Sequence, residues 1–144
     1  MIAVDANLLI YAHRSGAPEH SRAREAIERA ACDSRGWGMA LGTIVEFWSV
    51  VTHPSIPGRP STAAEALGFI ESLAETGGAE IWMPGPGFAR RLMQVAAVLK
   101  VAGPRIFDLQ IALTAFESGA HELWTNDSHF QSIPGLQVRN PISV

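Results

Sequence analysis

The sequence contains a single cysteine, Cys32, and a single lysine, Lys100. One thiol cannot form an internal disulfide, and it cannot supply the thiolate set of a structural zinc site. No apolar run approaches the ~18 residues that a transmembrane helix needs, and Asp5 interrupts the apolar start, so neither a membrane span nor a secretory signal is expected. These absences predict a cytoplasmic protein in which Cys32 is a small core residue.

Basic residues are also few. The 144 residues include 11 lysines and arginines against 14 acidic residues, which gives a formal net charge of −3. Nucleic-acid binding usually needs a basic surface, so this balance argues against it unless carboxylates gather around a cation such as Mg²⁺ that reverses the local charge. An apolar content of 47% suits one buried core, and the length predicts one domain over residues 1–144.

Hydrophobic periodicity divides the chain into alternating strands and helices. Strands are expected at residues 2–4, 79–83 and 122–125. Helices are expected near 19–32, 43–52, 88–99 and 108–119, and one more after the capping-box pattern at 62–65. The segment HPSIPGRPS at 53–61 predicts a loop. Strands separated by helices favour an α/β fold with a parallel sheet, in which ligands bind beyond the carboxyl ends of the strands.

Four acidic residues stand apart from the others. Asp5 and Asp127 each follow an expected strand, Asp108 opens an expected helix, and Glu46 has apolar neighbours on both sides. Each has an ordinary explanation: a helix cap for Asp5 and Asp108, an Asx-turn for Asp127 and an arginine partner for Glu46. Taken together they predict a cluster, because the topology brings their positions to one edge of the sheet. Asn7 is placed to hold Asp5.

Gathering carboxylates has an electrostatic cost that indicates their chemistry. Two unit charges ~4 Å apart repel by about 4 kcal/mol at an effective dielectric constant of ~20. A divalent cation removes this cost, and an all-oxygen ligand set without cysteine or histidine favours Mg²⁺ or Mn²⁺. Such a cluster can activate water and stabilise the leaving oxygen when a phosphodiester is hydrolysed.

Several segments of the sequence resemble the PIN-domain ribonucleases, and among these the VapC toxins of type II toxin-antitoxin systems. The segments are VDANLLIYA at 4–12, the helix with Glu46 and FWSVVTHP at 47–54, GPRIFDLQIALTA at 103–115, and ELWTNDSHFQSIPGLQVRNPI at 122–142. The resemblance implies a three-layer α/β/α sandwich with a central, mainly parallel sheet. It also implies Mg²⁺-dependent endoribonuclease activity, a cognate antitoxin that blocks the site, and a homodimer.

The resemblance also implies roles for particular residues. The metal ligands and catalytic acids would be Asp5, Glu46, Asp108 and Asp127, supported by Asn7 and Thr125. Metal-activated water would then cleave RNA and leave 5′-phosphate and 3′-hydroxyl ends. Two positions depart from the family pattern. Ala6 stands where many relatives have a hydroxyl residue, and His129 stands where many have a further acid, which suggests one tightly held ion and a second recruited by the substrate.

Substrate contacts are assigned to Arg59 and His129. His129 follows Asp127 closely, whereas the other four histidines are scattered without the spacing of metal ligands. Arg59, inside the proline-rich loop, is the preferred phosphate contact. It is chosen from the arginines that lie in loops or near the ends of elements, at positions 14, 59, 90, 91, 105 and 139.

The tryptophans and two helix faces complete the list of candidate contacts. Trp48, Trp82 and Trp124 lie in expected core elements and are predicted to pack there. Trp37, between two glycines, is a candidate for stacking on a base. The apolar faces of the helices near 44–51 and 63–73 are candidate dimer or antitoxin contacts.

Two other functions remain open at this point. A phosphatase resembling the haloacid dehalogenases also begins with an aspartate after a strand, but it needs an acid two residues later, where this chain has Asn7. Lys100, the only lysine, has no motif around it. The second alternative is a degenerate PIN domain that binds RNA or protein without cutting, and the complete set of four acids argues against it.

Overall fold

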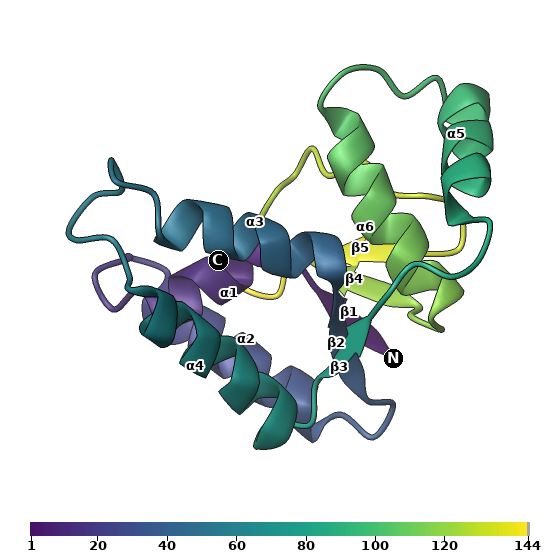
Figure 1. The fold of residues 1–144 in the computed structure, drawn as a ribbon. Helices are drawn as coiled ribbons and strands as arrows, with labels where there is room; N and C mark the ends of the chain where they lie inside the picture. Colours follow the sequence, from purple (N-terminus) through teal and green to yellow (C-terminus); the bar gives the residue numbers. More distant parts are fainter. Residues whose placement is uncertain (144) are drawn as a thin grey trace.

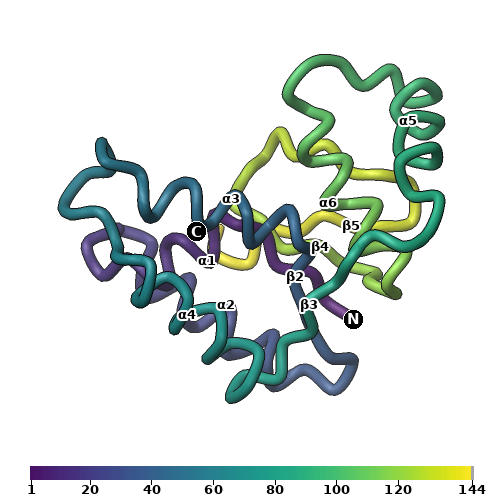
Figure 2. The backbone as a smooth tube through the Cα atoms, in the orientation of Figure 1, coloured from purple at the N-terminus to yellow at the C-terminus, as the bar shows by residue number. Residues whose placement is uncertain are grey.

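Five parallel strands form the centre of the molecule in a computed structural model that describes residues 1–143. The strand order is β3-β2-β1-β4-β5, so the first strand in the chain lies between β2 and β4 in the middle of the sheet (Figure 2). Every neighbouring pair is parallel. The strands are β1 (Ile2–Val4), β2 (Trp37–Ala40), β3 (Glu80–Trp82), β4 (Glu122–Trp124) and β5 (Gln137–Arg139).

Helices cover both faces of this sheet (Figure 1). One face carries α1 (Ala6–His13), α2 (His20–Cys32) and α4 (Ala63–Glu75), and the other carries α5 (Phe88–Leu99) and α6 (Arg105–Glu117). The remaining helix, α3 (Leu41–Val51), contacts both α1 and α6. This arrangement confirms the predicted three-layer α/β/α sandwich with a parallel sheet. No helix within residues 1–143 is long and apolar enough to cross a lipid bilayer.

The two halves of the core follow from the alternation of side chains along β1. Ile2 and Val4 are buried with α1 and α2 on one face, whereas Ala3 is buried against α6 on the other. Successive strand residues point to opposite faces, so a strand covered by helices on both sides must be apolar throughout. This explains the uninterrupted run Ile-Ala-Val before Asp5.

Most of the predicted elements are confirmed. Thr62 and Glu65 form the capping box at the start of α4: the Glu65 N–H donates to Thr62 Oγ1 at 3.1 Å, and the Thr62 N–H donates to Glu65 Oε1 at 3.0 Å. The expected start of α6 was wrong. The helix begins at Arg105, because Pro104 already has a helix-compatible φ of −64°, and Asp108 lies in the first turn rather than at the cap.

Two short strands, β2 and β5, were missed. β2 contains Gly38, which looks like a turn residue in the sequence. The structure requires a glycine there, because a Cβ atom would lie 2.6 Å from the Glu80 carbonyl oxygen and 2.7 Å from the Trp82 ring. β5 is an exposed edge strand with the sequence Gln-Val-Arg, so it has no apolar run to reveal it.

Three predictions about single side chains were wrong. Cys32 is exposed and is not a core residue. Trp48 is 42% exposed, because it lies on the outer side of α3, whereas Trp82 is buried as expected. Trp37 is only 2% exposed and its indole N–H donates to the Gly77 carbonyl at 2.8 Å, so it packs in the core and is not available for base stacking.

Candidate functional site

The carboxyl ends of β1 and β4 lie side by side at one edge of the sheet. Val4 pairs with Trp124 in the parallel register, and the Asp5 N–H continues the ladder by donating to the Trp124 carbonyl at 2.9 Å. Asp5 and Thr125 are therefore the first residues beyond two neighbouring strands. The topology brings together two residues that are 120 positions apart, as the sequence predicted.

Asp5 has a structural role as well as a place in the site. Its Oδ1 accepts from the Ala6 N–H at 2.8 Å, which caps α1. Its Oδ2 accepts from the Thr125 hydroxyl at 2.8 Å and from Asn7 Nδ2 at 3.4 Å. The capping explanation for Asp5 is confirmed, and these bonds supply the several donors that a buried carboxylate needs when it ionises.

Asn7 and Thr125 join the loop after β4 to the start of α1. Thr125 Oγ1 accepts from Asn7 Nδ2 at 2.8 Å and from the Asp127 N–H at 3.0 Å. Asn7 Oδ1 accepts from the Asn126 N–H at 3.0 Å. These bonds fix the backbone on either side of Asp127 relative to Asp5, which matches the supporting roles expected for Asn7 and Thr125.

Backbone donors of residues 126–131 hold the other two aspartates. The His129 N–H donates to Asp127 Oδ1 at 2.8 Å in an Asx-turn, and the Gln131 N–H donates to Asp108 Oδ2 at 3.2 Å. The Gln131 contact was missed in the sequence because it is made by the main chain, which carries no residue-specific signal. The loop after β4 thus holds its own Asp127 as well as Asp108 of α6.

The four acids form one electrostatic group. Burial is the main cause that raises the pKa of Asp5 to about 6; hydrogen bonds from Thr125 and Ala6 oppose the rise, and the charges of Asp108 and Asp127 add to it. Burial also raises the pKa of Asp108. Glu46 lies on the outward side of α3, yet partial burial and the charges of the three aspartates raise its pKa to about 7.

The four acids form no ion pair within residues 1–143, although the charge of Arg105 lowers the pKa of Asp108 slightly against the effect of burial. The arginine partner considered for Glu46 is therefore not found there. Most of the carboxylate lone pairs also remain free for further ligands. The arrangement is one that a cation would stabilise.

The donor chemistry suits a hard divalent cation, because all four side chains offer oxygen atoms. Within residues 1–143, however, no three carboxylate, imidazole or thiol side chains are already spaced as a set of metal ligands. Binding an ion therefore requires side-chain rotation toward a common centre. Glu46 and Asp127 are the exposed members that are free to make this movement.

Of the two predicted substrate contacts, one belongs to the hydrogen-bond network around the four acids and the other does not. His129 is exposed and joins the network through its backbone N–H. Arg59 lies outside the network and forms two 2.8 Å bonds to Glu65 near the start of α4. Neither placement tests contact with a substrate, so both assignments stay predictions.

Comparison with known proteins identifies the family. The family described as "PIN domain" matches residues 2–136. VapC ribonuclease Mb2897 of Mycobacterium bovis is 30% identical, and the match covers 99% of this chain and 96% of that protein. Ribonuclease VapC48 of Mycobacterium tuberculosis is 26% identical over 96% of both chains.

Solved structures with the same fold agree with this assignment. Mycobacterium tuberculosis VapC20, described as a sarcin-ricin loop cleaving toxin, has a TM-score of 0.68 at 12% identity and covers 90% of this chain and 92% of its own. VapBC2 from Rickettsia felis, solved with a DNA fragment from its promoter, has a TM-score of 0.63 at 20% identity and covers 97% and 98%. The chain belongs to the PIN domain family, and its curated relatives there are VapC ribonucleases.

Proposed function

We propose that this protein is a metal-dependent endoribonuclease that acts as the toxin of a type II toxin-antitoxin pair. The observation that supports this most directly is the group of four acids at the carboxyl edge of a parallel sheet, none of them in an ion pair within residues 1–143, in a chain related to VapC ribonucleases. The substrate is RNA, and hydrolysis leaves 5′-phosphate and 3′-hydroxyl ends. The whole chain acts as one domain in the cytoplasm.

Asp5, Glu46, Asp108 and Asp127 would hold Mg²⁺, or Mn²⁺ in its place. When bound, the ion supplies Lewis-acid chemistry that lowers the pKa of water and stabilises charge on the leaving 3′ oxygen. Thr125 and the Ala6 N–H keep Asp5 oriented, and Asn7 keeps the Asp127 loop against it. Burial and the charges of the three aspartates raise the pKa of Glu46 to about 7 in the metal-free protein, and a bound dication would lower it and favour the ionised carboxylate.

The proposal includes two protein partners. Relatives solved as VapBC2 and FitAB assemblies support a cognate antitoxin. Exposed apolar side chains on α3 and α4, such as Val45, Trp48 and Leu67, support contacts to the antitoxin or to a second copy of the chain. Both helices coincide with the apolar faces singled out in the sequence.

Cleavage of RNA by the purified protein with Mg²⁺, compared with Asp5→Asn, tests the activity. Wild type is expected to cut and the variant is not. Equal inactivity with retained RNA binding would support a non-catalytic binding module instead. Turnover of a generic phosphomonoester would support the phosphatase alternative. That enzyme needs a second acid two residues after Asp5, and this chain has Asn7 there.

Expression in cells tests the toxin role separately. Induction of this chain alone is expected to arrest growth, and co-expression with a small DNA-binding protein encoded by the adjacent upstream reading frame is expected to relieve the arrest. Growth that is unaffected by the active enzyme would contradict the toxin assignment while leaving the nuclease assignment intact.

A further inference from the structure

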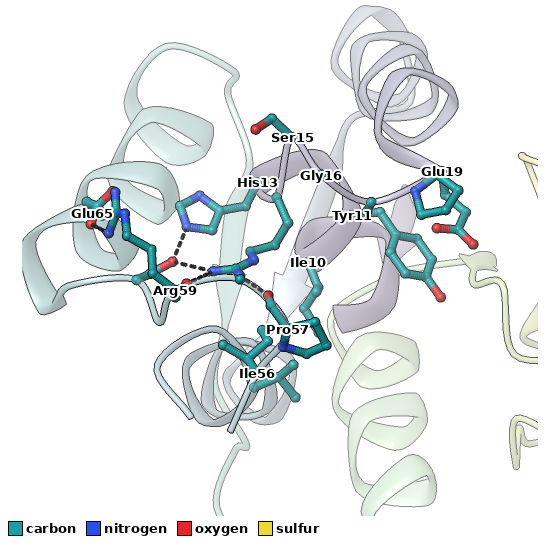
Figure 3. A pocket seen from close by; sticks show the side chains of 16 residues that line it. Ile10, Tyr11, His13, Ser15, Gly16, Glu19, Ile56, Pro57, Arg59 and Glu65 are labelled. Atoms are coloured by element: carbon teal, nitrogen blue, oxygen red, sulfur yellow. Dashed lines mark hydrogen bonds and ion pairs between the residues drawn. The ribbon is translucent and has the colours of Figure 1, made fainter. Parts of the chain in front are cut away.

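A cavity of about 750 Å³ opens beside the end of α1. Its walls come from α1, from the loop that leads to α2, from the end of α3, and from the proline-rich loop at 53–61. Figure 3 shows Ile10 and Tyr11 of α1 together with Ile56 and Pro57 of the loop around this cavity. Its size falls within the range of small-molecule sites, roughly 300–1,000 Å³.

The surfaces of α1 and α3 lead from the acidic site into this cavity. Asn7 and Tyr11 are four residues apart, so they share one side of α1, and Arg14 follows three residues later as the C-cap of this helix. All three are half-buried, whereas Leu8, Leu9 and Ala12 on the other side are buried. On α3, Glu46 and Val50 are likewise four residues apart, and Val50 lines the cavity.

Arg14 gives the cavity a fixed positive charge. Its Nη1 and Nη2 donate to the carbonyls of Arg59 and Pro57, each at 2.7 Å. Carbonyl oxygens are neutral, and no ion pair within residues 1–143 includes Arg14. The guanidinium is therefore held in place while its charge and remaining N–H groups stay available for an anion.

Two acids also line the cavity, and neither is paired with Arg14 in an ion pair within residues 1–143. Glu65 is occupied by the ion pair with Arg59. Glu19 lies on the side of Tyr11 (Figure 3). The apolar walls and the Tyr11 ring offer surfaces for a flat aromatic group, and Arg14 offers a partner for a phosphate.

We propose that this cavity binds a nucleotide of single-stranded RNA next to the cleaved phosphate, with Arg14 contacting its phosphate and Tyr11 its base. This inference rests on the proposed ribonuclease function, and it adds a site that selects substrates. Asn7 and Arg14 are seven positions apart, which corresponds to ~10 Å at the rise of an α-helix. A substrate must therefore extend beyond the scissile linkage to reach the cavity, and a dinucleotide does not.

The test uses two changes that act in different ways. Val50→Trp fills the cavity from a position that is already 37% exposed, and Arg14→Gln removes the charge, with Arg14→Lys to restore it. Matched controls are Val98→Trp, at a position that is 80% exposed on α5, and Arg24→Gln, an exposed arginine of α2. All are combined with Asp108→Asn to prevent cleavage, and folding is checked by circular dichroism.

Fluorescence anisotropy then measures binding of a labelled mixed-sequence RNA about 12 nucleotides long and of a labelled dinucleotide. Val50→Trp and Arg14→Gln are expected to weaken binding of the longer RNA about 10-fold, as loss of one base or phosphate contact does. Arg14→Lys should recover part of the affinity. The controls and all dinucleotide affinities should remain unchanged.

Unchanged affinity of folded Val50→Trp and Arg14→Gln for the longer RNA would overturn the inference. So would variants that keep RNA affinity but, in the cleavage-competent chain, escape inhibition by the antitoxin, because the cavity would then belong to a protein partner. Cleavage by wild type with Mg²⁺ is measured in parallel. Its absence would contradict the proposed function, whereas normal wild-type cleavage with unaffected variants would contradict this site alone.

Discussion

The two ends of β4 place acids in opposite electrostatic surroundings. At its start, Glu122 lies 3.1 Å from Arg139 Nε and 3.5 Å from Arg35, and it accepts from the Trp124 indole N–H at 3.1 Å. Burial alone would raise the pKa of Glu122, but the bonds from Trp124 and Arg35 outweigh it and the pKa falls. Beyond the other end of β4, the pKa of Asp5 rises.

This difference in the direction of the pKa shift separates acids that are paired with cations from acids that are not. Glu122 is stabilised by its partners and contributes to the fold. Asp5, Asp108 and Glu46 repel one another and form no ion pair within residues 1–143. Folded proteins keep such unfavourable groups mainly at functional sites, where a ligand relieves the cost.

Removing one acid at each end of β4 should give the largest contrast in activity. Asp108→Asn removes a charge needed to hold the cation and is expected to lower RNA cleavage by about 1,000-fold. Glu122→Gln should leave the rate within about two-fold. Initial cleavage rates with Mg²⁺ measure both. Equal losses in the two variants would show that the electrostatic contrast has no functional meaning.

The stability of the metal-free protein should fall as the pH rises. Asp5 has a pKa of about 6 when folded, against an ordinary value of 3.8 for an aspartate. The folded state therefore binds the proton more tightly, and stability is lost as pH rises through this window, by roughly 3 kcal/mol for Asp5. The raised pKa of Glu46, about 7, likewise lowers the stability of the folded protein as the pH rises toward that value.

Urea denaturation in EDTA at about pH 5 and pH 8 measures this effect. The acids that are paired with arginines, such as Asp33 and Glu65, have pKa values of about 2. Their contribution to stability is complete by pH 5 and does not mask the trend. Asp5→Asn should flatten the dependence. The lowered pKa of His13 acts in the opposite direction over this window, so the comparison of wild type with Asp5→Asn is the test. The same pH dependence in both proteins would contradict the raised pKa of Asp5.

Magnesium should reverse that loss. An ion that binds only the folded state stabilises it by about 2.7 kcal/mol at 100 times its Kd. The melting temperature of wild type near pH 8 should therefore rise with Mg²⁺, and Glu122→Gln should show the same rise. Asp108→Asn should not. A rise of equal size in Asp108→Asn would place the ion elsewhere on the molecule.

The hydroxyl of Thr125 should matter less than the acids, since it orients Asp5 without binding the substrate. Thr125→Val removes the donor at 2.8 Å from Asp5 Oδ2 and is expected to lower the cleavage rate about 10-fold. It should also raise the pKa of Asp5, because that bond favours the ionised form. Thr125→Ser should restore both. A pH–rate profile that does not move in Thr125→Val would argue for packing alone.

The smallest effect is expected for the stability of Glu122→Gln. Both arginine partners are about half exposed, so the loss should be about 1 kcal/mol or less and should shrink further with added salt. Urea denaturation at two salt concentrations measures it. A loss as large as that predicted for the pH dependence of Asp5 would mean that this pairing is less screened than its exposure indicates.

The parts of this molecule that the sequence predicted are those with strong local patterns. The apolar run before Asp5, the capping box at Thr62 and the helical spacing of residues 88–99 each depend on neighbours within a turn or a strand. No such local pattern predicts β5, because its pairing with β4 depends on a distant segment. The exposure of Trp48 likewise depends on how α3 is oriented against the rest of the fold.

The sequence by itself determined which carboxylates follow strands and which chemistry they suit, since alternation and residue type are local properties. Only the tertiary structure decided that Thr125 bonds Asp5, that Gln131 holds Asp108 through its backbone, and that Arg14 lines a cavity where it bonds the carbonyls of Pro57 and Arg59. These contacts join residues from 23 to 120 positions apart. The packing of strands and loops creates them, and no spacing in the sequence encodes them.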